Sequence, residues 1–110
     1  MAFDVANHLD YVADTFGDNV TVIDGLGGQY GSINVCGAPF GAVWSQATLH
    51  VYVTCLGISG PAGLSVLSGL SVVKTIASPS PLVGFVGAMY DEFNDRVYVT
   101  TSNDKVCLVS

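Results

Sequence analysis

Positively charged residues are the scarcest group in this sequence of 110 residues. Three Lys and Arg stand against nine Asp and Glu, which gives a net charge of −6. A protein that binds nucleic acid neutralises phosphates with clustered Lys and Arg, whereas Lys74, Arg96 and Lys105 are few and scattered. We therefore expect no nucleic-acid partner.

Long apolar runs are also missing. A membrane-spanning helix needs about 18 or more consecutive apolar residues, and no such run occurs, so we expect no membrane span. Residues Met1 to Asp4 have neither the positive charge nor the apolar stretch of a signal peptide, so none is expected within this chain. The localisation stays unknown on these grounds.

Cysteine is sparse, and its spacing is uninformative. Cys36, Cys55 and Cys107 form no C-x-x-C pair and have no His at ligand spacing, so they make no metal-binding motif. At most one disulfide can form within the chain. Because an isolated cysteine packs as a small hydrophobic residue, we expect buried free thiols.

Charge is absent from the middle of the chain. No Asp, Glu, Lys or Arg occurs from Gly25 to Val73. A soluble domain normally scatters charge over its surface. This segment is therefore expected either to be covered by neighbouring structure or another chain, or to present a surface of Ser, Thr, Gly and Asn.

Strand-forming residues are abundant and arranged in a repeat. Half of the residues are hydrophobic and 13 are Gly. Residues 3–12 align without a gap with 44–53 and 90–99, at offsets of 41 and 46, and each segment runs from an aromatic residue to Tyr-Val. Apolar and polar residues alternate, as in Val20-Thr21-Val22, which indicates strands. Strand repeats with a period in the low to middle forties are typical of β-propeller blades.

We therefore predict an all-β fold, with one β-propeller segment over residues 1–110 built of four-stranded antiparallel sheets. The blades are expected at 1–36, 37–79 and 80–110, the last lacking its outermost strand, which makes about two and three-quarter blades. Second strands are expected at 10–13, 51–54 and 97–100, and outermost strands at 30–35 and 71–77. Small residues such as Gly41 and Gly87 suit innermost strands, where backbones approach closely.

The segment Tyr11-Val12-Ala13-Asp14 followed by Asn19-Val20-Thr21-Val22-Ile23-Asp24 resembles the blade signature of the YVTN family of β-propeller repeats, and is similar to NHL repeats. Residues 38–43 resemble the lead-in to the next blade of that family, and Cys55 and Thr101 replace the usual Asn after Tyr-Val-Thr. The resemblance implies a propeller, an extracytoplasmic location, and a binding, scaffold or enzymatic role.

A closed propeller needs roughly four to eight blades. Fewer blades leave apolar faces and a sheet edge uncovered. We therefore expect either a homo-oligomer that completes the ring or a fragment of a longer propeller, and we favour the homo-oligomer.

Asp14 and Asp18, together with Asn19, are weak candidates for a Ca²⁺ site, because their oxygens are the ligands that this ion prefers. The same residue types are common in hairpin turns, which is the role we favour. His8 and His50 lie at neighbouring repeat positions and are candidate ligand contacts, as a histidine pair can bind a transition metal.

Trp44 is a third candidate ligand contact, because its ring could stack on a sugar. It shares its repeat position with Phe3 and Tyr90, which favours packing between sheets. Asp91, Glu92 and Asp95 could make an acid/base pair, but a solvated turn suits their position better.

No catalytic residue or cofactor is expected. We interpret the chain as a non-catalytic binding or scaffold module that self-associates to close a ring and that has a glycan or protein ligand. The alternative is a fragment or subunit of a propeller enzyme of the lactonase, lyase or cofactor-dependent dehydrogenase type, as the resemblance allows. A second alternative is an incomplete propeller fragment with no independent function.

Overall fold

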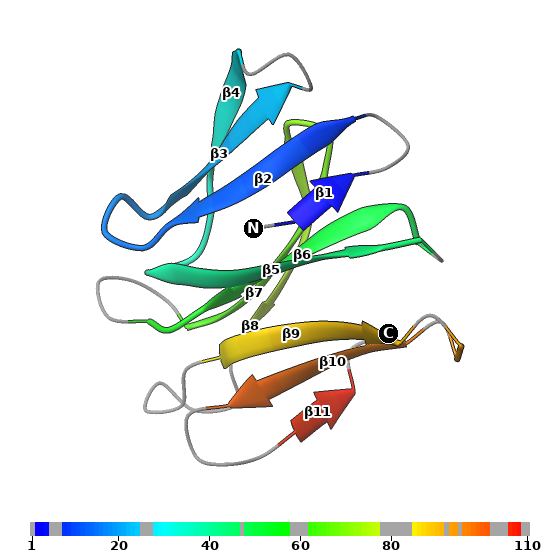
Figure 1. The fold of residues 1–110 in the computed structure, drawn as a ribbon. Helices are drawn as coiled ribbons and strands as arrows, with labels where there is room; N and C mark the ends of the chain where they lie inside the picture. Colours follow the sequence, from blue (N-terminus) through cyan, green and yellow to red (C-terminus); the bar gives the residue numbers. More distant parts are fainter. Residues whose placement is uncertain are drawn as a thin grey trace.

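The computed structural model describes residues 2–4, 8–24, 28–46, 48–57, 62–77, 85–91, 93–94, 96–101 and 106–108. These residues are all-β: they form strands, turns and connections, and no helix among them could cross a membrane. The strands make three antiparallel sheets, and within each sheet they follow one another in chain order (Figure 1).

The first sheet contains β1 (Ala2–Asp4), β2 (Leu9–Asp14), β3 (Asn19–Asp24) and β4 (Gln29–Asn34). The second contains β5 (Pro39–Ser45), β6 (His50–Cys55), β7 (Gly63–Ser68) and β8 (Ser71–Ala77). The third contains β9 (Phe85–Asp91), β10 (Arg96–Thr101) and β11 (Val106–Leu108). The predicted second and outermost strands are thus confirmed to within a residue or two. The expected boundary between residues 79 and 80 lies outside the described residues.

The three sheets share local backbone features at repeat-related positions. The aligned Tyr-Val pairs lie on β2, β6 and β10, the second strand of each sheet. His8 and Leu49, which are 41 residues apart, both adopt the left-handed conformation in the turn before that strand, with φ of 56° and 59°. The pairing register also skips Phe40 in β5 and Val86 in β9, which are 46 residues apart. The sequence repeat therefore corresponds to a structural repeat.

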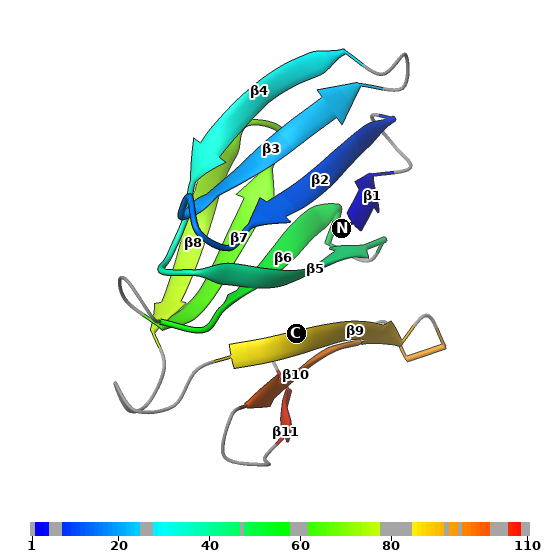
Figure 2. The same ribbon diagram turned by 60° about the vertical axis from the view of Figure 1, so that its left-hand side comes forward.

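Each sheet has two faces, which the Tyr-Val pair distinguishes because successive residues of a strand point to opposite sides. The Tyr side carries Tyr11, Tyr52 or Tyr98, and the Val side carries Val12, Val53 or Val99. One apolar cluster joins the Tyr side of the first sheet (Leu9, Tyr11, Val20, Val22) to the Val side of the second (Val51, Val53, Leu67). A second cluster joins the Tyr side of the second sheet (Tyr52, Leu64, Val66) to the Val side of the third (Val97, Val99). The second sheet therefore lies between the other two, as Figure 2 shows.

The sheets contact one another mainly through their first two strands. Strands β1 and β2 contact β5, and β5 and β6 contact β9. A Cβ added at Gly41 on β5 would lie 2.9 Å from Thr54 Oγ1 and 3.1 Å from the Val86 carbonyl oxygen on β9, so a larger residue would require these neighbours to shift. The expected close approach of first strands is confirmed at this position.

Hydrogen bonds reinforce the contact between sheets. Three side-chain hydroxyls donate to backbone oxygens of the next sheet or its turns: Tyr11 to Gly69 (3.0 Å), Thr15 to Pro39 (2.9 Å) and Thr54 to Val86 (2.8 Å). Each of these bonds fixes the position of one sheet along its neighbour, which apolar packing alone does not do.

The uncharged middle segment has two kinds of surroundings. On β6, Val51, Tyr52 and Val53 are buried in succession because both faces of the second sheet are covered. On β8, Val72 and Val73 are exposed together with their Ser and Thr neighbours. The central strands therefore lack charge because neighbouring structure covers them. The outermost strand instead presents an exposed surface with Ser and Thr.

Replacing Tyr11 with Phe tests the contribution of the bond to Gly69. Burial, and to a lesser extent the Asp4 carboxylate, raises the pKa of Tyr11, so its hydroxyl stays protonated and donates. Loss of this bond in Tyr11→Phe should lower the free energy of unfolding by about 1 kcal/mol, measured by denaturant unfolding. Tyr30→Phe is the matched control, since Tyr30 is 55% exposed, and it should change stability by less than about 0.5 kcal/mol. Equal losses in the two variants would contradict the assignment.

Candidate functional site

The two aspartates that were weak metal candidates serve as acceptors for backbone amides. Asp14 Oδ1 accepts a hydrogen bond from Gly17 N (3.2 Å) within the β2–β3 turn. Asp18 Oδ1 accepts one from Ala38 N (2.8 Å), and the Asp18 backbone oxygen accepts one from Val35 N (3.1 Å). Asp18 therefore ties this turn to the connection between β4 and β5. Among the residues whose positions are described, no three His, Cys, Asp or Glu side chains form a group that could hold a metal ion.

The other candidate residues lie on, or next to, the first two strands of their sheets. His8 is exposed in the turn between β1 and β2, and His50 is the half-buried first residue of β6. Trp44 on β5 is half-buried and packs against the first apolar cluster, on the Val side of the second sheet. Tyr90, at the same repeat position in the third sheet, packs against the second cluster.

The acidic turn after β9 holds its first carboxylate in the charged form. Asp91 accepts hydrogen bonds from Asn94 Nδ2 (2.8 Å) and Phe93 N (3.0 Å). These bonds, led by the one from Asn94, lower the pKa of Asp91, with a further small effect of Arg96. A general acid at neutral pH needs a raised pKa, so Asp91 is unsuited to that role. Its hydrogen bonds stabilise the turn instead. Glu92 and Asp95 lie outside the described residues.

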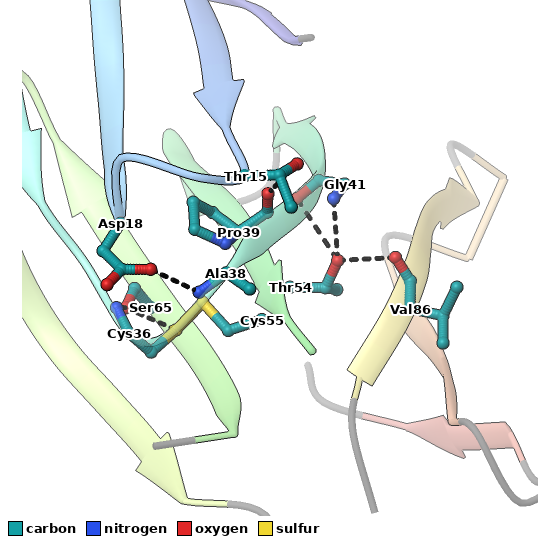
Figure 3. The surroundings of a disulfide bond; sticks show 10 residues. All are labelled: Thr15, Asp18, Cys36, Ala38, Pro39, Gly41, Thr54, Cys55, Ser65 and Val86. Carbon is teal, nitrogen blue, oxygen red and sulfur yellow. Dashed lines mark hydrogen bonds between the residues drawn. A yellow bond between two sulfur atoms is a disulfide. The ribbon is translucent and has the colours of Figure 1, made fainter. Parts of the chain in front are cut away.

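The expectation of free thiols is wrong for two of the three cysteines. Cys36 and Cys55 form a disulfide with a Cα–Cα distance of 5.8 Å, which Figure 3 shows. Cys36 lies in the connection between β4 and β5, and Cys55 ends β6, so the bond fastens the exit of the first sheet to the second. The two cysteines are 19 residues apart in the sequence. The antiparallel pairing of β5 with β6 brings them together, and cysteine spacing alone does not predict it. Of the Cys107 side chain nothing is described.

Polar side chains hold the segment around Cys36 by hydrogen bonds. Ser65 on β7 is buried, and its hydroxyl accepts a hydrogen bond from Cys36 N (3.3 Å) and lies 3.2 Å from Cys36 Sγ. Asp18 holds the next part of the same connection through Ala38, whose φ of 52° is left-handed (Figure 3). The connection is therefore fixed by one covalent bond and by side chains from two different sheets.

The Tyr side of the third sheet faces away from the other two sheets and is open. Met89 and Val106 on this face are 62% and 67% exposed. Together with neighbouring residues they line a shallow depression of about 490 Å³: Gly87, Ala88, Met89, Tyr98, Thr100 and Val106. No separate signal for this surface is present in the sequence, but the repeat relates Tyr98 to the buried residues Tyr11 and Tyr52.

Comparison of the chain with protein-family models and with curated proteins finds no match.

A thiol titration tests the disulfide. Since two of three cysteines are bonded, the unfolded, unreduced protein should react with one equivalent of thiol reagent, and with three after reduction. Replacing Cys36 and Cys55 by Ser should lower the free energy of unfolding by about 3 kcal/mol, because the unfolded chain loses its cross-link. Cys107→Ser is the control that keeps the disulfide. Three reactive thiols before reduction would contradict the bond.

Replacing Asp18 separates its turn role from a metal role. In Asp18→Ala the amide of Ala38, which is buried, loses its acceptor, at a cost of about 1–3 kcal/mol. Asp18→Asn keeps an acceptor oxygen and a residue that tolerates the left-handed φ of 54°, so it should lose less. Added Ca²⁺ should leave the melting temperature of the wild type unchanged. A rise with Ca²⁺ that Asp18→Asn abolishes would instead establish a metal site.

Proposed function

We propose that this chain is a non-catalytic binding or scaffold module of the β-propeller type that associates with other copies of itself. One observation carries the proposal: the Tyr side is buried in the first and second sheets by the sheet that follows, and open in the third. Exposed apolar patches of this kind mark interaction sites in soluble proteins.

The propeller assignment is supported by the repeat of sheets in chain order and by the resemblance to YVTN blades. Each sheet packs its Tyr side on the Val side of the next, in the same direction along the chain. A stack that repeats in one direction is the arrangement that radial repetition of blades requires. In this proposal the ring is closed by association of several copies.

An extracytoplasmic location is supported by the Cys36–Cys55 disulfide, since such bonds persist in oxidising compartments and are rare in the cytosol. A protein ligand is favoured over a glycan, because the ring of Trp44 packs within the chain while the open apolar face belongs to the third sheet.

The mass of the native protein tests the proposal. Light scattering and native mass spectrometry should give a multiple of the 11.4 kDa chain mass, and the melting temperature should rise with protein concentration. Cys36→Ser with Cys55→Ser, compared at the same concentration, shows whether the disulfide affects association or only folding. A folded species of 11.4 kDa at all concentrations would contradict self-association.

A further inference from the structure

We propose that the open Tyr side of the third sheet binds the open Val side of the first sheet of a second copy, in a head-to-tail contact. This inference rests on the self-association proposed above and specifies its surfaces. The Tyr-side surface consists of Gly87, Met89, Tyr98, Thr100 and Val106. The Val-side surface consists of Asp10, Val12, Thr21 and Ile23, which are partly exposed and belong to neither apolar cluster.

The direction of the contact follows from the two contacts inside the chain. In each of them a Tyr side receives a Val side, and no two like sides meet. The open surfaces at the two ends are one of each kind. A second copy placed head-to-tail therefore repeats the contact that the chain already makes twice. Contacts of this heterologous kind can close into rings.

Thr100 repeats on the open surface the bond that Thr54 makes within its own sheet. Thr54 Oγ1 accepts from Gly41 N at 3.0 Å and donates to the Val86 oxygen of the next sheet at 2.8 Å. Thr100 lies 46 residues later, and its Oγ1 accepts from Gly87 N at the same 3.0 Å. Its hydroxyl lies 3.5 Å from the oxygen of Gly87 in its own sheet. Thr54 Oγ1 likewise lies 3.3 Å from the Gly41 oxygen of its own sheet, so the open surface keeps the local geometry of a closed contact.

Charge distinguishes the two open surfaces from the closed contacts. Leu9 and Val51 belong to the same cluster between the first and second sheets. Arg96 stands at the repeat position of Leu9, and Asp10 stands at that of Val51. The second contact has His50 and Val97 at these two positions. Residues of opposite charge therefore occur at these positions only at the two open ends. Head-to-tail contact would bring Arg96 of one copy toward Asp10 of the next, and complementary charge of this kind selects the partner surface.

A charge-swap experiment tests the contact. Arg96→Asp and Asp10→Arg each place like charges across the interface, so each should weaken self-association by about tenfold or more. Mixing the two variants should restore association, because each mixed contact again joins opposite charges. Lys74→Asp is the control: it makes the same change of charge as Arg96→Asp, on the exposed outermost strand β8, and should associate like the wild type. Sedimentation velocity gives the dissociation constants, and thermal unfolding shows that each variant is folded.

Restored association in the mixture supports the head-to-tail contact. If the wild type associates but mixing restores nothing, or if Asp10→Arg associates like the wild type, the contact is wrong while self-association stands. Contact between two like Tyr sides would give the second result. If Arg96→Asp does not fold, Met89→Asp, which places an acidic group on the same surface away from the acidic turn, takes its place and should dissociate. A wild type that stays monomeric overturns both proposals.

Discussion

Burial of both faces of a sheet is the constraint on which this structure depends. A four-stranded sheet whose strands alternate between two apolar faces is stable only when each face is covered. The second sheet meets this condition within the chain, since its Tyr side and Val side both belong to apolar clusters. The first and third sheets each meet it on one face. The same requirement therefore explains the order of the stack and the two surfaces that remain open.

Apolar burial has no direction along the sheet surface, so other interactions must set the position of each sheet on the next. The bond from Thr54 to Val86 fixes the second sheet against the third at its first strands. The disulfide and the bond from Asp18 to Ala38 fix the connection from the first sheet into the second. The bond to Val86 lies where β5 and β9 approach closely, and the absence of a side chain at Gly41 permits that approach.

The strands and their order could be predicted from the sequence because each depends on local alternation and on the repeat. The succession Val51-Tyr52-Val53 even indicates burial on both faces, in contrast to Asp10-Tyr11-Val12, where one face carries a charged residue. The disulfide could not be predicted, because it depends on how β4 leads into β5 relative to the end of β6. The role of Asp18 as an acceptor for an amide 20 residues away was likewise invisible, although its residue type correctly favoured a turn.

The distribution of charge follows from the same constraint. Acidic residues are frequent in the first sheet and basic residues occur only after Val73, so charge is excluded from the strands that are covered on both faces. Asp10 of the first sheet stands at the repeat position that Val51 occupies in the contact between the first and second sheets. Arg96 of the third sheet stands at the repeat position of Leu9, which belongs to the same contact. A charge on such a face is costly if it is buried alone and acceptable if an opposite charge meets it. The open faces are therefore suited to a partner that carries the complementary charge, which the proposed head-to-tail contact supplies by joining Asp10 to Arg96.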